Sequence, residues 1–370
     1  AIACIPKSIM LLFIPATILT YPQNQTVAAG QTAAFSVEAT GSNELTYQWQ
    51  RRARGEVIAQ DIPGATDPDY VTPPVATADQ ASEYTVRVRD TQGNIALGSA
   101  MLTVTPTSPA VYYIDYLTGD DANDGTAKST PWRQAPGMKG CSDLCLITTL
   151  HPGDQIVFKG GVTWDSQAFP MNITRSGTSD DRIYYGADKT WFAGSAWARP
   201  KFDLSGAVFT EPPVLVSFAH FITLDDIEIR NARLDNFNQY RTTGAITVEG
   251  AASVTVQNCY IHGWSVANPL PGSAASAAIS FFSDTYDGTV ENCMLDGSPA
   301  GDTVTAIYGG RFIRGNVIQN VPNAIVIQSD QEDVEISGNH IFNIRHSLDP
   351  TQDENGIVVW GPARIFNNVI

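Results

Sequence analysis

The residue types that could carry catalysis are unevenly distributed along this 370-residue sequence. Abstraction of a proton next to a uronate carboxylate needs a basic side chain, commonly Lys or Arg, together with neutralisation of the carboxylate charge. No lysine follows Lys201, so a lysine base in the later part of the chain is excluded. In the middle part of that region, the arginines left for this role are Arg311, Arg314 and Arg345.

Hydrolysis of a glycosidic bond needs a pair of carboxylates at a suitable separation. Acids near predicted bends or loops are Asp284, Asp287, Asp296, Asp353 and Glu354, with His262 and His346 as potential partners. One cluster combines basic side chains with carboxylates, because Arg345 and His346 precede Asp353 and Glu354 across a single loop. These four residues are the candidate catalytic residues, and a loop salt bridge or solvated turn carboxylates are the alternative interpretation.

Aromatic side chains near the same loops could bind carbohydrate, because an aromatic face suits the apolar face of a pyranose ring. The candidates for this role are Trp264, Tyr286 and Trp360, with Phe281 and Phe282 close by in the sequence. Core packing explains Phe281 and Trp360 equally well.

Metal and thiol chemistry have weaker support. The five cysteines are Cys4, Cys141, Cys145, Cys259 and Cys293, and none forms a paired Cys-x-x-Cys pattern of the kind that binds zinc. Calcium could bind the acids between Asp330 and Glu335, but their spacing does not match an EF-hand loop. Cys141 and Cys145 bracket a short turn, which closes as a disulfide in an oxidising compartment or leaves two unpaired loop cysteines.

Composition limits the class of partner. Acids outnumber bases 38 to 22, which gives a formal charge of −16 and would repel nucleic acid and anionic lipid. Charged residues make up only 16% of the chain, and 43% of it is hydrophobic, which is enough for more than one core. This composition favours an extracellular or cell-surface protein without nucleic-acid partners.

A short motif recurs in the second half of the chain: apolar, any, Asn or Gly, small or Asn, any, aliphatic. Its copies begin at Ile229, Val256, Val290, Ile313, Ile336 and Ile365. Short strands on either side of an Asn or Gly bend are typical of a β-solenoid, in which each coil stacks on the last and shares one core.

The fourth position of the motif predicts an inward-facing ladder of small or amide side chains. The ladder residues are Ala232, Cys259, Cys293, Asn316, Asn339 and Asn368. Stacked Asn side chains would satisfy one another's amides between coils, which offsets the cost of burying them. In the same ladder Cys259 and Cys293 are expected as small packed thiols rather than as a disulfide or a nucleophilic site.

The residues that precede the repeat resemble the opening of bacterial right-handed parallel β-helix proteins of the pectate-lyase-like superfamily. The resemblance rests on the Gly/Asp-rich stretch from Gly119 to Gly125 and on the Pro-Gly-Asp strand from Pro152 to Gly161. In such proteins these segments form the cap and the first coils. The resemblance implies that residues 110–370 form a right-handed parallel β-helix, and the sequence stops within its sixth motif copy, so we expect a fragment of a longer protein.

Residues 18–106 alternate short apolar strands with Gly, Pro and Asn turns, a pattern typical of a β-sandwich. The segment around Tyr47-Gln-Trp49 and the Tyr84 strand resemble bacterial immunoglobulin-like modules. Where many relatives have a disulfide between the sheets, this chain has Val37 and Val86, so Trp49 is expected to pack on aliphatic side chains. The expected fold is all-β, an immunoglobulin-like sandwich followed by the solenoid.

Residues 1–17 include part of an apolar run from Ile9 to Leu19 that is too short to span a bilayer as a helix and is interrupted by Pro15. The run is either the remnant of a secretion signal or a strand donated to a neighbouring subunit, which would make a homo-oligomer.

Two functional classes follow from these features. The first is an extracellular structural or adhesive protein, with potential for filament assembly and for binding polysaccharide or a cell surface. The second, implied by the β-helix resemblance, is a secreted polysaccharide lyase or glycoside hydrolase acting on acidic polysaccharide. The absence of a recognisable catalytic set favours the first class.

Overall fold

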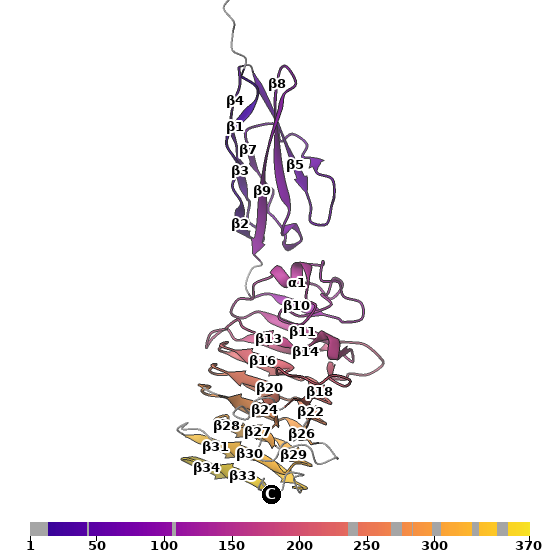
Figure 1. The fold of residues 1–370 in the computed structure, drawn as a ribbon, viewed down its shortest axis with the longest axis vertical. Coiled ribbons are helices and arrows are strands. Elements are labelled where there is room, and N and C mark those ends of the chain that lie inside the picture. The colour runs from indigo at the N-terminus through magenta and orange to yellow at the C-terminus, as the bar shows by residue number, and fades with distance from the viewer. Residues whose placement is uncertain are drawn as a thin grey trace, which may run out of the picture. The chain divides into compact units, whose positions relative to one another are not determined.

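The computed structural model describes residues 14–42, 44–105, 109–235, 243–267, 276–282, 284–297, 305–327, 333–345 and 354–370. The chain divides into two compact units, Ala1–Thr107 and Ser108–Ile370, and each is built almost entirely from β-strands (Figure 1). Within the described residues the helical segments are α1 (Asp143–Ile147) and the 3₁₀ turns η1 (Thr77–Asp79) and η2 (Ser166–Ala168). The fold class predicted from the sequence, all-β with a sandwich and a solenoid, is confirmed.

The first unit is an immunoglobulin-like sandwich. Its five-stranded sheet has the order β2 (Gln25–Ala28), β9 (Ile95–Thr105), β8 (Glu83–Asp90), β5 (Leu45–Arg52) and β6 (Gln60–Asp61). Two antiparallel pairs complete it, β3 (Ala34–Ser36) with β7 (Asp69–Val71) and β1 (Thr17–Thr20) with β4 (Glu38–Thr40). Trp49 is buried together with Val37 and Val86, and its indole donates a hydrogen bond to the carbonyl of Asp67 at 3.0 Å.

The apolar run near the N-terminus is described only from residue 14 onward. Its last part lies in β1, where Ile18 pairs with Ala39 of β4 in the same chain and is buried in the sandwich core. Residues 9–13 of the run lie outside the described residues. The described part of the run therefore has its strand partner within its own unit.

The second unit is a parallel β-solenoid of three sheets. Sheet I has nine strands: β10 (Val111–Ile114), β11 (Gln155–Gly160), β14 (Ile183–Phe192), β17 (Ile222–Asp225), β21 (Thr255–Gln257), β25 (Thr289–Glu291), β28 (Phe312–Arg314), β31 (Val334–Ser337) and β34 (Ala363–Phe366). Sheet II has seven: β12 (Thr163–Asp165), β15 (Lys201–Asp203), β18 (Glu228–Arg230), β22 (Tyr260–His262), β26 (Met294–Asp296), β29 (Val317–Gln319) and β32 (His340–Phe342). Sheet III also has seven: β13 (Met171–Ile173), β16 (Val214–Ser217), β20 (Thr243–Glu249), β24 (Ser276–Phe282), β27 (Thr305–Tyr308), β30 (Asn323–Ile327) and β33 (Asn355–Val359). A short pair, β19 (Arg233–Leu234) with β23 (Ser265–Val266), lies between sheets II and III in the chain.

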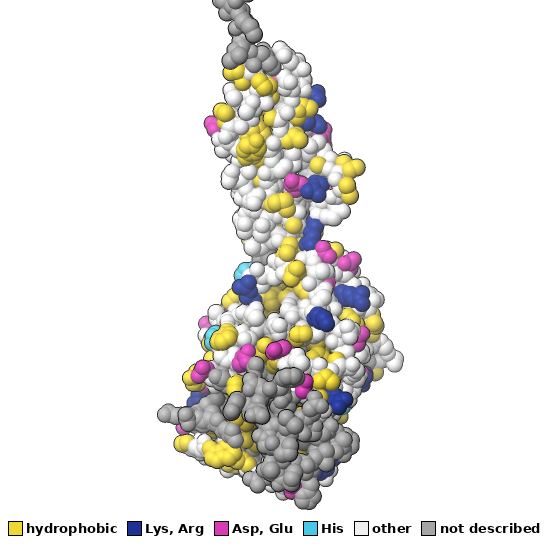
Figure 2. Space-filling model, viewed as in Figure 1, with side chains coloured by type: hydrophobic (Ala, Val, Ile, Leu, Met, Phe, Trp, Pro, Cys, Tyr) yellow, Lys and Arg dark blue, Asp and Glu magenta, His cyan; other side chains and the backbone are white. Residues whose placement is uncertain are grey.

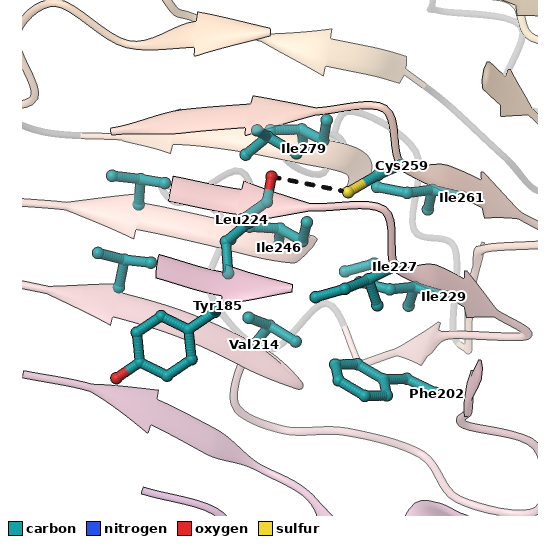
Figure 3. Packing of buried hydrophobic residues seen from close by; sticks show 14 of the residues in the cluster. Tyr185, Phe202, Val214, Leu224, Ile227, Ile229, Ile246, Cys259, Ile261 and Ile279 are labelled. Atoms are coloured by element: carbon teal, nitrogen blue, oxygen red, sulfur yellow. Dashed lines mark hydrogen bonds between the residues drawn. The ribbon is translucent and has the colours of Figure 1, made fainter. Parts of the chain in front are cut away.

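Successive coils stack in register, and one elongated apolar interior runs through them (Figure 3). In sheet I the motif positions Val256, Val290, Ile313, Ile336 and Ile365 are consecutive register partners, as the repeat predicts. Alternation within each short strand directs these aliphatic side chains inward and their neighbours outward. The core is therefore continuous from the first coil to the last described one.

The first copy of the motif was assigned to the wrong strand. The register partner of Val256 in β17 is Leu224, whereas Ile229 lies in sheet II and pairs with Ile261. Ala232 is accordingly not a ladder residue, and Ile227 takes that place, because its carbonyl accepts the hydrogen bond from Tyr260. The error has a physical cause: each coil has two sharp bends, and both favour Asn or Gly.

The bend between sheets I and II is one residue in the left-handed region. Its residues are Asp226, Asn258, Asn292, Gly315, Gly338 and Asn367, with φ between 54° and 64°. Asn, Asp and Gly tolerate this conformation better than other residues, which is why the motif requires them. The second bend uses Asn231, Gly263, Asn320 and Asn343 in the same way.

The remaining five predicted ladder residues lie in one column just after the first bend, where Cys259, Cys293, Asn316 and Asn339 are buried and Asn368, on the last coil, is half-buried. Asn316 Nδ2 donates to Asn339 Oδ1 at 3.0 Å, and Asn339 Nδ2 donates to Asn368 Oδ1 at 2.8 Å. The backbone N–H of Cys293 donates to Asn316 Oδ1 at 2.9 Å, which extends the ladder to the thiols. Each buried amide thus has partners on the neighbouring coil.

A cap covers the first coils. It contains α1 and a loop in which Asp121 accepts hydrogen bonds from the backbone N–H groups of Arg133, Gln134 and Ser142. A disulfide joins Cys141 to Cys145 with 5.7 Å between their Cα atoms, beside Leu144 in the core. Within the described residues, no helix is long and apolar enough to cross a membrane.

Candidate functional site

Of the four candidate catalytic residues, the structure describes Arg345 and Glu354. Arg345 donates to the carbonyl of Asn320 at 2.6 Å and so supports a coil bend. Glu354 is exposed just before β33. His346 and Asp353 lie outside the described residues. The catalytic role of these four residues therefore stays a prediction.

Trp264 is not a sugar-binding residue, which corrects the sequence-based prediction. Its side chain is 0% exposed, and its indole nitrogen donates to the carbonyl of Thr305 at 3.1 Å. The residue follows the bend at Gly263, where the chain turns inward before β23. A sugar ring cannot reach a tryptophan that is fully enclosed in the solenoid core.

Tyr286 and Trp360 are exposed, at 60% and 55%, at the corner where the chain passes from sheet III to sheet I. Trp360 lies on the last coil of this sequence, where the motif position Ile365 is 50% exposed as well. The same corner holds Phe218, which is 74% exposed and directly follows β16. Phe218, Tyr286 and Trp360 follow β16, β24 and β33 of sheet III. In the strand order of this sheet, β16 and β24 are two steps apart, and β24 and β33 are three steps apart. At about 4.8 Å per rung, these steps are about 10 and about 14 Å along the solenoid axis.

Phe218 belongs to no sequence motif, so the sequence does not identify it as an exposed aromatic residue. Its backbone conformation is unusual for a bulky side chain. Its φ is 51°, in the left-handed region that a bulky side chain seldom occupies. A Cβ on Gly250, in the next coil, would lie 2.5 Å from Cε1 of the Phe218 ring. The ring therefore rests on a position that only glycine can provide, and an aromatic side chain is held on the surface at a conformational cost.

Carboxylates on the outer sheet faces are mostly paired with bases or amides. Figure 2 shows acidic and basic side chains interspersed on the visible face of the solenoid. Asp287 pairs with Arg311, Glu335 with Arg314 at 2.8 Å, and Asp296 accepts from Gln319 at 2.8 Å. These contacts account for acids that were candidates for a hydrolase pair or for calcium. Asp330 itself lies outside the described residues.

One pair of carboxylates does lie on neighbouring rungs. Asp165 of β12 and Asp203 of β15 are register partners in sheet II, and no other register pair in the described solenoid strands joins two acids. Arg230 donates to Asp203 at 2.6 Å, and Tyr116 donates to Asp165 at 3.1 Å. Backbones on neighbouring rungs are about 4.8 Å apart, close to the carboxylate separation of retaining glycosidases.

The pKa values of Asp203 and of Glu228, both in sheet II, do not favour acid catalysis. Burial alone would raise the pKa of Asp203, but hydrogen bonds from Ser205, Arg230 and Asn231 outweigh it and hold the pKa below its ordinary value. The hydrogen bond from His262, at 3.2 Å, lowers the pKa of Glu228. A general acid needs the opposite shift.

Among the described carboxyl groups, Asp121 is the one whose pKa is raised, and burial is the largest cause. Its contacts are to backbone N–H groups of the cap. It therefore has a structural environment rather than the environment of a catalytic acid.

The two thiols of the ladder are equally unsuited to catalysis. Cys259 and Cys293 are unpaired and buried. Burial and then the neighbouring thiol of Cys259 raise the pKa of Cys293 well above its ordinary value. A nucleophilic cysteine needs an accessible thiolate, so these residues are packed thiols.

Two cavities of the second unit are lined by described residues. One, of about 440 Å³, lies beneath the cap and is lined by residues that include the Cys141–Cys145 disulfide, Arg175 and Tyr185. The other, of about 370 Å³, lies beside the second bend and is lined by residues that include Val208, Arg233 and Ser265. Neither contains a predicted site residue other than the disulfide cysteines. Within the described residues, no group of three or more His, Cys, Asp or Glu side chains could hold a metal ion.

No protein-family model matches the chain. Over 155 residues the chain is 26% identical to a lacto-N-biosidase of Bifidobacterium longum subsp. longum, a match that covers 37% of this chain and 9% of that protein. The chain thus spans less than a tenth of this relative's length.

Solved structures that are similar to part of this chain include immunoglobulin domains. A chimeric titin Z1Z2 carrying a decorin peptide is 22% identical over 26% of this chain and 99% of that chain, with a TM-score of 0.22. The immunoglobulin domains 1–5 of Sidekick-1 are 25% identical over 25% of this chain and 20% of that chain, with a TM-score of 0.21. The immunoglobulin-like assignment rests on the strand arrangement of the first unit, to which these low scores add nothing.

Proposed function

We propose that the chain is part of an extracellular, cell-surface adhesive protein whose solenoid binds polysaccharide without cleaving it. In this proposal the solenoid is a member of the right-handed β-helices of the pectate-lyase-like superfamily, and the sandwich is a spacer. The observation that carries the proposal is the aromatic row, defined as Phe218, Tyr286 and Trp360, at the corner between sheets III and I.

Three arguments support the aromatic row as a binding surface. Large apolar side chains exposed at one corner cost solubility and gain no core packing, so folding does not explain them. The left-handed backbone of Phe218 adds a conformational cost. Platforms spaced along the axis suit an extended polymer, because several weak contacts to one chain add up to useful affinity.

The test is binding of the full chain to a panel of immobilised neutral and acidic polysaccharides, compared with single alanine variants of Phe218, Tyr286 and Trp360. Each ring is expected to contribute about 1 kcal/mol, so each variant should bind about fivefold more weakly. Tyr21→Ala is the matched control, because Tyr21 is an exposed aromatic residue of the sandwich. Equal affinity of wild type and the triple variant for every glycan would refute the proposal.

A second candidate function is hydrolysis of a glycosidic bond at Asp165 and Asp203. The specific observations in its favour are the neighbouring carboxylates on sheet II and the partial similarity to a lacto-N-biosidase. In a retaining mechanism Asp203, whose pKa is low, would be the nucleophile and Asp165 the acid and base.

This alternative is tested by release of reducing sugar from the glycans that the chain binds. Hydrolysis by wild type that is abolished in both Asp165→Asn and Asp203→Asn, but retained in Glu291→Gln, would establish the hydrolase. Glu291 is a suitable control because it lies on the outer face of sheet I, away from sheet II. Binding without any release of reducing ends would support the adhesive function.

A further inference from the structure

The cavity beneath the cap, which is independent of the aromatic row, has the features of a ligand site. It has a volume of about 440 Å³ and lies among α1, the end of β13 and β14. Its apolar lining includes Leu146, Leu150 and the Cys141–Cys145 disulfide. Cavities of this size with apolar walls and a few polar groups are typical of small-molecule sites.

Tyr185 gives this cavity an unused hydrogen-bond donor. Its side chain is 1% exposed, yet it lines the cavity. In Figure 3 its hydroxyl points away from the aliphatic side chains labelled around it. No hydrogen bond to this hydroxyl exists within the described residues. Burial is the main cause that raises the pKa of Tyr185, so the hydroxyl stays protonated and needs an acceptor.

Arg175 gives the same cavity an unpaired positive charge. It follows β13 in the chain, lines the cavity and has no ion pair within the described part of the solenoid. Most other bases there do have one, such as Lys159 with Asp115 at 2.7 Å and Arg314 with Glu335 at 2.8 Å. Arg175 is an exposed residue that lines this cavity, so its guanidinium is available to an anionic ligand.

We propose that this cavity binds a small organic carboxylate with an apolar body. The carboxylate accepts hydrogen bonds from the Arg175 guanidinium and the Tyr185 hydroxyl, and the apolar body contacts Leu146, Leu150 and the disulfide. A carboxylate suits the site because it offers two acceptor oxygens to a planar guanidinium. An apolar body suits the side of the cavity formed by Leu146, Leu150 and the disulfide, while Thr148, Asn172 and Thr174 line the more polar side.

The experiment uses the full chain and three probes in isothermal titration: sodium benzoate, benzyl alcohol and sodium acetate. Benzyl alcohol keeps the ring without the charge, and acetate keeps the charge without the ring. Benzoate is expected to bind at least about tenfold more tightly than either, because only benzoate uses both halves of the cavity. Equal affinity for benzoate and benzyl alcohol would overturn the role of Arg175.

Two variants and one control locate the binding. Arg175→Gln should weaken the binding of benzoate about tenfold or more, and Tyr185→Phe should weaken it about fivefold. Tyr185→Phe removes only an unpaired hydroxyl, so its melting temperature should equal or exceed that of wild type. Arg233→Gln alters the other cavity and should change benzoate affinity less than about twofold. No saturable benzoate binding, or the same loss in Arg233→Gln as in Arg175→Gln, refutes the proposal.

Discussion

A single amide on each late coil satisfies polar groups that would otherwise be buried without partners. Asn316 shows this most fully, since it donates to Asn339 and to the carbonyl of Val290 and accepts from the backbone of Cys293. On the earlier coils Cys259 and Cys293 fill the same column with sulfur. The ladder therefore changes from amides to thiols without interrupting the core.

Replacement of Asn316 by alanine should lower the free energy of unfolding by about 2–4 kcal/mol, because it leaves buried groups on two neighbouring coils without partners. Gln319→Ala, on the same coil, removes a hydrogen bond to Asp296 on the outer face and should cost less than about 1 kcal/mol. Urea unfolding followed by circular dichroism measures both. Similar losses for the two variants would contradict the burial argument.

The low pKa of Asp203 predicts a dependence of stability on pH. Its folded pKa lies below the unfolded value of 3.8, so its stabilising contribution is present above that value and is lost as the pH falls further. The unfolding free energy should decrease from about pH 5 to about pH 2, and Asp203→Asn should decrease less. The exposed Asp180→Asn is the control and should follow wild type in urea titrations at each pH.

For single residues, the sequence predicted most of the ladder residues correctly but did not predict which aromatic side chains are exposed. Asn339 and Asn368 repeat at a fixed place in a motif, so their burial can be read from the pattern. Trp264 and Trp360 are both tryptophans next to a Gly, but Trp264 lies inside the solenoid core, whereas Trp360 lies on the last coil of this sequence. Phe218 has no sequence signal, since its surface position depends on a glycine in the next coil.

Among the elements, the bends decide the architecture more than the strands do. Strands of three or four residues have little stability alone, and the left-handed residue between sheets I and II fixes where each coil turns. Both bends of a coil use the same residue types, so a pattern search cannot tell them apart. That ambiguity is why the copy at Ile229 was placed one strand too late.

The cap depends on its disulfide. The bridge closes a short loop around α1, and by the loop-entropy estimate its removal should cost about 2 kcal/mol. The double variant Cys141→Ser and Cys145→Ser should show faster amide exchange in α1 and weaker benzoate binding in the cavity that the bridge lines. Unchanged exchange in α1 would show that packing of Leu144 alone holds the cap.

The whole molecule contains two separate cores. One surrounds Trp49 in the sandwich, and the other extends along the solenoid from Ala110 to Ile341. Composition and turn pattern were enough to predict two units, because each unit has its own periodicity. The function could not be predicted at this scale, since it depends on which side chains the corners present.

A core mutation should therefore affect one thermal transition and leave the other unchanged. Trp49→Ala should cost about 3–5 kcal/mol in the sandwich, and Asn316→Ala should destabilise the solenoid alone. Differential scanning calorimetry of the full chain distinguishes the two effects. A single transition that both variants shift by the same amount would show that the units unfold as one.

The in-register stacking of Asn316 on Asn339, 23 residues apart, has a consequence for how such a molecule changes in evolution. Gene segments that encode one whole turn can be duplicated or lost while every surviving turn still finds an equivalent neighbour. The length of the solenoid would then vary in steps of about 4.8 Å. Related strains could carry alleles of different length that share one architecture and present their surface groups at different heights.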